Sequence, residues 1–370
     1  MSDYFIKKLE KIDSSFIKEW NKLWEASPNA SVFNSPEWIK MSEESQKFNE
    51  FEIFACYDEK GELYAVLPLS KIRCFGVKVY APPSYKGILK TAFLVRNYEE
   101  KLFRKFFDQI LKGKNLYIPK IDSIEVSLLH KIFPNFFFSL ISVNPYLNFE
   151  SEPLRYLSKT FQYKKRKIER LYGNQLILKT YGEKDNLENL LDTIFEIDIQ
   201  SAKSTKSMDI FSKQENREFY KNIVKHCRKF VDIAILYYKQ KPIAYIFNLT
   251  YKKVYQDCQT SYLNDYRKLS PGIILLTKLL AYLSVKGYNI FDFSGGISDY
   301  KRNFTPHYYV QYNLYYSKNP LIMHWWRGIN LIRRLKQILF PIKFTKDHEF
   351  LFKPLSKELK EQRGNLIKRE

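Results

Sequence analysis

A basic loop followed by Ser-Pro-Gly carries the strongest chemical signal in the sequence. Arg267 and Lys268 stand just before Ser270, Pro271 and Gly272, which open a long apolar segment. The free N–H groups and the positive dipole end of a helix attract phosphate oxygens, and the two side chains add full positive charges. This order of residues predicts an anion site, although Ser-Pro-Gly taken alone also suits an ordinary helix start.

A strand, a helix and a second strand must position that loop. Residues 254–260 read as a strand, and after a polar loop Ser270 is expected to cap a helix whose first turn accommodates Pro271. The following run IILLTKLLAYLSVK is apolar on nearly every side, which predicts a buried helix that ends at Gly287. The short apolar strand YNIFDF completes a β-loop-helix-β unit.

Cysteine and histidine spacing argues against metal chemistry. The chain has four cysteines without a C-x-x-C pair and five histidines without an H-E-x-x-H pattern. We therefore expect reduced cysteines, no disulfide framework and no metal. The cysteines are Cys56, Cys74, Cys227 and Cys258, and the histidines are His130, His226, His307, His324 and His348.

The net charge of +21 attracts polyanions, anionic membrane surfaces and phosphorylated small molecules alike. Two segments concentrate it. KKRKIER (164–170) reads as a basic helix in the middle of the chain, typical of a solvated face. The segment 325–344, WWRGINLIRRLKQILFPIKF, interleaves aromatic, apolar and basic residues, which is typical of an interfacial helix and also compatible with ordinary packing.

Two strand-turn-strand units predict an internal duplication. Residues 51–70 alternate apolar and polar side chains around D-E-K-G, and residues 231–250 do so around K-Q-K-P. Helical stretches precede both units, so the sequence predicts an α+β fold built from two similar domains.

The region 145–160, with two prolines and mixed polarity, is the best boundary. We expect domains at 1–150 and 151–345, followed by a charged tail at 346–370. The N-terminus lacks a targeting pattern and no apolar run reaches bilayer length, which predicts a cytoplasmic protein.

The string DYRKLSPGIILLTKLLAYLSVKGYNIFDFSGGISDYKRNF (265–304) resembles the signature of the CelD/BcsL-like group of GNAT acyltransferases. FNSPEWIK (33–40), AVLPL (65–69) and LSKTFQYKKRKIERL (157–171) resemble other elements of that group. The resemblance spans roughly residues 15–317 and is most specific from Ser-Pro-Gly to Tyr-Lys.

The resemblance implies two tandem GNAT-like domains, as in the FemAB peptidyltransferases, with an acyl-CoA against the second. GNAT proteins hold the pyrophosphate with a Q/R-x-x-G-x-G/A loop, and Arg267-x-x-Ser270-x-Gly272 matches it with serine for the first glycine. Pro271 removes a backbone donor there. Lys268 and Lys301 are further candidates for contact with the cofactor.

Acyl transfer from a thioester to an amine needs a base for the ammonium proton and a donor for the departing thiolate. Asp257, before the loop, and Asp292, after the helix, are candidate bases, and each could instead be a structural carboxylate. Tyr300 is a candidate proton donor. Cys258 lacks a local histidine, so a nucleophilic role is disfavoured.

The expected activity is acyl-CoA-dependent N-acylation, most simply N-acetylation and not aminoacyl transfer, of a cell-envelope or polysaccharide precursor bearing an amino group. Two alternatives remain open. A FemAB-like enzyme would use aminoacyl-tRNA, which the positive charge suits, and a degenerate GNAT pair would serve as an accessory protein of envelope synthesis. We expect no specific nucleic acid partner, and contact with an anionic membrane at its inner face remains open.

Overall fold

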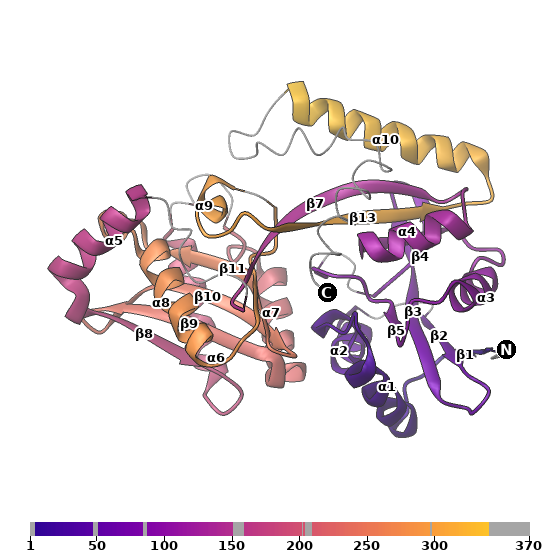
Figure 1. Cartoon of the computed structure of the whole chain (residues 1–370), viewed down its shortest axis with the longest axis horizontal. Helices are drawn as coiled ribbons and strands as arrows, with labels where there is room; N and C mark the ends of the chain where they lie inside the picture. The colour runs from indigo at the N-terminus through magenta and orange to yellow at the C-terminus, as the bar shows by residue number, and fades with distance from the viewer. Residues whose placement is uncertain are drawn as a thin grey trace. The chain divides into compact units, whose positions relative to one another are not determined.

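The computed structural model describes residues 4–46, 51–83, 87–150, 159–201, 203, 209–296 and 298–339. The chain divides into two compact units (Figure 1). The first contains residues 1–144, 296–298 and 309–370, and the second contains 145–295 and 299–308. The predicted tail at 346–370 and the central part of the predicted boundary, 151–158, lie outside the described residues.

The first unit is a mixed sheet with helices. Its sheet order is β1-β2-β3-β4-β6-β13-β7, with β5 paired to β3 and with β4 and β6 parallel. The strands are β1 (Phe5–Leu9), β2 (Phe51–Tyr57), β3 (Leu63–Cys74), β4 (Val77–Ala81), β5 (Leu94–Val95), β6 (Leu116–Asp122), β7 (Phe137–Asn148) and β13 (Tyr308–Tyr316). The helices are α1 (Ser14–Ala26), η1 (Val32–Asn34), α2 (Pro36–Gln46), α3 (Glu100–Ile110), α4 (Ser123–Ile132) and α10 (Pro320–Leu339).

The second unit follows the same plan. Its sheet runs from the C-terminal residues of β7 through β12-β11-β10-β9 to β8, and β11 and β12 are parallel. Its strands are β8 (Leu176–Tyr181), β9 (Val231–Tyr238), β10 (Lys241–Tyr251), β11 (Val254–Tyr262) and β12 (Ile290–Asp292). Its helices are α5 (Lys159–Tyr172), η2 (Gly173–Gln175), α6 (Leu187–Ile199), α7 (Gln214–His226), η4 (Arg228–Phe230), η5 (Asn264–Leu269), α8 (Pro271–Val285) and α9 (Asp299–Arg302).

Both predicted hairpins and the predicted α+β character are confirmed. β2 pairs with β3 and β9 with β10 in antiparallel register. The β9–β10 turn places Lys239 and Gln240 at φ 48° and 67°, the left-handed pair of a two-residue hairpin turn. The predicted basic helix is α5, and the predicted buried helix is α8, which packs against β9, β10 and β11 (Figure 1).

The last strand of each half explains where the sequence prediction of the domains differs from the structure. Apart from the two-residue strand β5 in the first half, and leaving out the short 3-10 helices, the element order β-α-α-β-β-β-α-β-α-β occurs twice, ending in β7 and in β13. β13 follows the second half of the chain but hydrogen-bonds with β6 in the first unit. Residues 309–339, predicted to lie in the second domain, therefore belong to the first unit, because sheet pairing and not chain order decides membership.

The described helices include none that combines the length and apolarity required to cross a bilayer.

Glu125 at the start of α4 is a buried carboxyl in the first unit. Its Oε1 accepts from Asn29 Nδ2 and from Tyr98 Oη, both at 3.3 Å, while Oε2 is buried without a hydrogen-bond partner among the described residues. Burial, with Asp122 nearby, raises the pKa of Glu125 to about 8. The folded state therefore holds a proton that the unfolded chain releases near pH 4.5.

We predict that Glu125 makes the protein less stable as pH rises from about 4.5 to about 8, because the folded state binds more protons in that window. Glu125→Gln should remove this part of the pH dependence. The free energy of unfolding of the variant, relative to that of the wild type, should therefore increase by up to a few kcal/mol from pH 5 to pH 9. Urea unfolding at pH 5 and at pH 9 measures this difference, and Glu59→Gln, at an exposed position, is the control. An equal pH dependence in wild type and Glu125→Gln would contradict the prediction.

Candidate functional site

The two parallel strands of the second unit separate at the residues predicted to do chemistry. β11 and β12 pair only through Val254, Tyr255 and Gln256, the last of which is opposite Asp292. Beyond this point, among the described strands, β11 pairs with β10 alone as far as Tyr262. The register slips at Cys258, so that Asp257 pairs with Asn248 and Gln259 with Phe247. A bulge of this kind re-aims side chains and ends pairing. The result is a fork with Asp257 at its base.

The N-terminus of α8 offers fewer donors than a standard helix start. Ser270 occupies the N-cap position in the left-handed conformation, φ 48° and ψ 50°, without a side-chain cap hydrogen bond. The prediction that its side chain caps the helix is therefore wrong, because that cap requires an extended backbone. Its carbonyl accepts from Ile273 N at 3.0 Å and Ile274 N at 3.2 Å.

Gly272 supplies the open donor of this first turn. Pro271 has no N–H, and the N–H of Gly272 has no hydrogen-bond partner among the described residues. A Cβ at Gly272 would meet Tyr262 Cδ1 at 3.7 Å, an ordinary contact. The protein itself therefore does not require glycine here, which leaves close approach of a ligand as a reason for it.

Arg267 and Lys268 lie in η5, directly before this turn, and both side chains are exposed. Neither forms a hydrogen bond or ion pair with any residue that the structure describes. The predicted pair of cations is therefore present at the helix start and available to an anion.

Asp257 is a half-buried carboxyl beside two lysines. Burial raises its pKa to about 6, and the charge of Asp292 adds to that rise, while Lys301 and Lys203 lower it. A carboxyl with such a pKa is ionised at neutral pH and is a much stronger base than an ordinary aspartate.

Asp292, the other predicted base, is fully engaged within the protein. It is 1% exposed. Its Oδ1 accepts from Ser294 N at 2.9 Å and its Oδ2 from Gln256 Nε2 at 3.4 Å. These bonds hold a turn in which Ser294, Gly295 and Gly296 all have positive φ. These contacts indicate that Asp292 is a structural carboxyl group that fixes the turn after β12.

From α9, Lys301 binds the same turn and Tyr300 binds the start of α8. Lys301 Nζ donates to Phe293 O at 2.9 Å and also to Ser294 O. Tyr300 Oη donates to Gly272 O at 3.3 Å. Burial, together with Asp257, raises the pKa of Tyr300, so the phenol remains a proton donor at neutral pH.

Sequence reasoning missed three residues of this site. Lys203 Nζ donates to the carbonyl of Thr260 on the free edge of β11, and burial lowers the pKa of Lys203. Gln256 Nε2 bridges Asp292 and Ser294 Oγ, the latter at 3.1 Å. Lys203 lies in a loop remote in sequence from β11, and glutamine and serine give no local signal, so only the fold identifies them.

Cys258 is unsuited to nucleophilic catalysis, as expected. Its Sγ lies 3.6 Å from Gln256 O, and burial beside Asp257 and Asp292 raises the pKa of the thiol. A protonated thiol is a weak nucleophile.

The first unit lacks the basic helix start. Its equivalent helix, α3, begins with Glu99 and Glu100, and Glu99 accepts from Tyr4 Oη at 2.6 Å and Tyr64 Oη at 2.7 Å. Negative charge at this position disfavours phosphate. The two units therefore differ at the helix start that the sequence identifies as an anion site.

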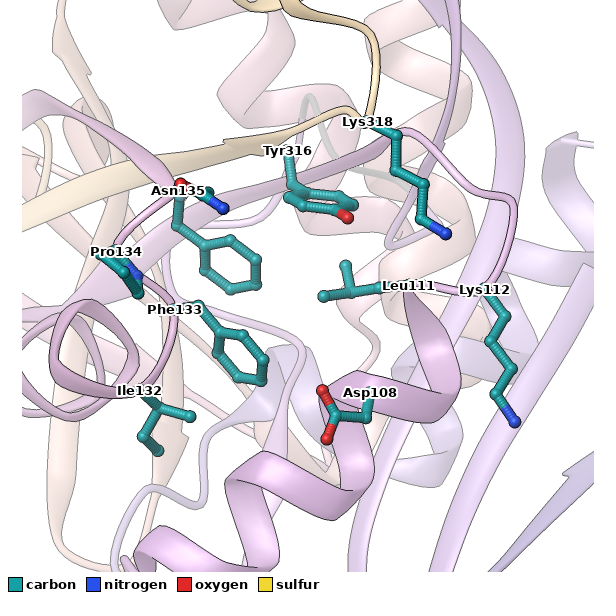
Figure 2. A pocket seen from close by; sticks show the side chains of 10 residues that line it. Asp108, Leu111, Lys112, Ile132, Phe133, Pro134, Asn135, Tyr316 and Lys318 are labelled. Carbon is teal, nitrogen blue, oxygen red and sulfur yellow. The ribbon is translucent and has the colours of Figure 1, made fainter.

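Figure 2 shows a cavity of about 340 Å³ in the first unit. Phe133 and Tyr316 line its interior, and Asp108, Lys112 and Lys318 lie at its edge. It contains none of the predicted site residues.

Residues 156–302 match a family described as the acetyltransferase (GNAT) domain, and this range contains the fork, α8 and α9. No curated protein matches the sequence significantly.

The fold as a whole is similar to three solved structures, at identities that show the fold alone. FemX matches with a TM-score of 0.62 and 11% identity, over 86% of this chain and 99% of FemX. The C-terminal DUF2156 domain of an Agrobacterium fabrum protein assigned as a lysylphosphatidylglycerol synthetase matches with a TM-score of 0.54 and 10% identity, over 85% and 95%. L-PGS from Bacillus licheniformis matches with a TM-score of 0.51 and 12% identity, over 81% and 96%.

The predicted relation to GNAT proteins is thus confirmed for residues 156–302, which match the acetyltransferase (GNAT) domain family. The predicted fold of two GNAT-like domains agrees with the repeated element order, and the fold of the whole chain is similar to that of FemX.

Proposed function

We propose that this GNAT protein is an acyl-CoA-dependent N-acyltransferase, with acetyl-CoA as the simplest donor. The observation that carries the proposal is the position of Asp257, a carboxyl with a raised pKa at the base of a strand fork, beside a helix start with two exposed cations. Together these features suit binding of a phosphorylated thioester and removal of a proton from an amine.

The donor's phosphates would bind at the start of α8. Gly272 N–H provides one backbone donor, whereas Pro271 provides none. The positive charges of Arg267 and Lys268 would compensate for that missing donor. A guanidinium can contact two phosphate oxygens at once, so Arg267 is the residue on which binding should depend most.

The transfer itself needs one base and one acid. Asp257 would accept the proton of the acceptor's ammonium group, and the free amine would attack the thioester carbonyl. The new C–N bond forms as the C–S bond breaks, and Tyr300 would donate a proton to the departing thiolate. The second proton that the attacking nitrogen loses to become an amide would return to the Tyr300 phenolate. The raised pKa of Tyr300 keeps that proton in place before the step.

We assign Asp292 and Lys301 to positioning, because their contacts lie within the protein. Asp292 orders the turn after β12, and Lys301 binds two carbonyls of that turn while its charge faces Asp257. Lys203 would act in the same electrostatic way from its loop, where its ammonium group contacts the carbonyl of Thr260 on β11.

The acceptor we propose is an amino group on a cell-envelope or polysaccharide precursor, modified in the cytoplasm. Structural neighbours that include a protein assigned as a lysylphosphatidylglycerol synthetase support an envelope molecule as acceptor. Acyl length and acceptor identity are questions for a panel of substrates.

A second candidate is aminoacyl transfer from charged tRNA. The observation favouring it is α5, on which Lys164, Arg166, Lys167 and Arg170 are exposed. Such a basic helix face suits phosphate backbones. The structural likeness to FemX extends over both units and is compatible with either donor.

We predict that Arg267→Ala weakens acetyl-CoA binding by roughly 10- to 100-fold, because it removes a charged contact with phosphate. Calorimetry with acetyl-CoA and longer acyl-CoAs measures the affinity. Lys286→Ala, at the other end of α8, is the matched control and should bind as the wild type does. Absence of acyl-CoA binding to the wild type, with saturable binding of aminoacyl-tRNA, would replace this proposal by the second candidate.

Gly272→Ala distinguishes an effect on ligand binding from an effect on the stability of the fold. The added methyl group makes only an ordinary contact with Tyr262, and alanine favours a helix over glycine by about 1 kcal/mol. The variant should therefore melt at the wild-type temperature or above, yet bind acyl-CoA at least several-fold more weakly because the methyl group keeps the phosphates away from the backbone. Unchanged affinity in a stable variant would place the phosphates elsewhere.

Asp257→Asn should lower kcat by roughly 10²- to 10⁴-fold, the usual contribution of a general base. In the wild type the rate should rise with pH through about 6 and then level off, since the carboxyl must be ionised to accept a proton. Release of the CoA thiol with a panel of amino sugars as acceptors measures both effects. Asp265→Asn, on the exposed surface of η5, is the control. A wild-type pH profile retained in Asp257→Asn would exclude Asp257 as the base.

A further inference from the structure

Helix α10 of the first unit is apolar on two opposite faces. One face is buried: Met323, Trp326 and Asn330 pack against the sheet, with Trp326 against Tyr315 of β13 and Asn330 Oδ1 accepting from Ser139 Oγ at 2.9 Å. Figure 1 shows α10 lying along β7 and β13. Burial against the sheet therefore explains the apolar residues on this face of α10.

The opposite face carries a second apolar stripe that the first unit leaves exposed. Leu321, Trp325 and Ile332 are 76%, 54% and 55% exposed, and Leu331 beside them is 57% exposed. Spacings of three and four residues, through Gly328, place Leu321, Trp325 and Ile332 in one line along the helix. Exposed apolar side chains gathered on one helix mark an interaction surface more often than single ones do.

Basic residues border the stripe and no acidic residue interrupts it. Arg333 lies over the ring of Phe75 at 4.4 Å, and Arg327 over that of Phe137 at 5.8 Å. The twenty residues of α10 include Arg327, Arg333, Arg334 and Lys336 but neither Asp nor Glu. Arg327 and Arg333 therefore lie on either side of the apolar stripe with their charges over aromatic rings.

The neighbouring β3–β4 hairpin extends this charge. Trp325 Nε1 donates to Phe75 O in the hairpin turn at 3.0 Å, which fixes the indole at the helix surface. Arg73 and Lys78, a cross-strand pair of the hairpin, are both exposed. Residues 63–81 contain no acidic side chain.

We propose that α10 and the β3–β4 turn form a docking surface for an anionic lipid bilayer. The helix would lie in the interface with Leu321, Trp325 and Ile332 among the acyl chains and the basic residues at the headgroups. An apolar stripe with tryptophan and flanking arginines is the composition of an interfacial helix, and the positive charge selects an anionic surface over a neutral one.

Co-sedimentation with lipid vesicles tests the proposal on the full chain. Binding should be at least tenfold tighter to phosphatidylcholine vesicles containing a third of phosphatidylglycerol than to phosphatidylcholine alone. The double variant Leu321→Ser, Ile332→Ser should bind at least tenfold more weakly, because both side chains are exposed and their loss leaves the buried face intact. Val285→Ser, 88% exposed on α8, is the matched control and should bind as the wild type does.

Tryptophan quenching by brominated lipids provides a second measurement. Trp325 is exposed whereas Trp20, Trp24, Trp38 and Trp326 are buried, so quenching should fall sharply in Trp325→Phe. If high salt abolishes binding and the double variant still binds as the wild type does, the interaction is purely electrostatic, and the proposed docking surface is overturned. Dimerisation in solution that the double variant abolishes, without vesicle binding, would also overturn it in favour of a second copy of the chain.

Discussion

The parallel pairing of β11 with β12 ends at Gln256 and Asp292, and the candidate site depends on where it ends. A strand that loses its neighbour has an edge of free backbone groups, and in a folded protein such an edge needs partners. Lys203 satisfies one carbonyl of this edge, at Thr260. The bulge at Cys258 turns Asp257 within the same few residues. Strand separation and the bulge therefore place the proposed base just beyond the last paired residues of β11 and β12.

The turn after β12 is the counterpart of that fork. Ser294 adopts a positive φ of 47°, which is costly for a residue other than glycine, and Gly295 and Gly296 continue the turn with positive φ. The carboxyl group of Asp292 binds Ser294 N, and the ammonium of Lys301 binds Phe293 O beside it. The same Lys301 charge lowers the pKa of Asp257 against the effect of burial. One lysine thus contributes to the conformation of the turn and to the electrostatics of the proposed base.

Duplication provided two copies of this β-α-β unit, and the residues at the helix starts differ between them. α8 begins after Arg267 and Lys268, whereas α3 begins with Glu99 and Glu100. Opposite charges at equivalent helix starts give the two units opposite preferences for an anion. The second unit alone matches the GNAT acetyltransferase domain family, in agreement with that difference.

Local sequence patterns were sufficient for the features that depend on neighbouring residues. Alternation predicts both hairpins, Pro271 and Gly287 mark the ends of α8, and the order of Arg267, Lys268 and Ser-Pro-Gly predicts the basic helix start. These features follow from steric and dipole effects within a few residues. Tertiary structure decided what depends on distant pairing: that β13 joins the first unit, that Ser270 does not cap α8, and that Lys203 faces Asp257. It also distinguished the two predicted bases. Asp292 is hydrogen-bonded within the protein by Gln256 and Ser294, whereas burial raises the pKa of Asp257. Both effects come from residues that only the fold brings around each carboxyl group, so local sequence does not predict them.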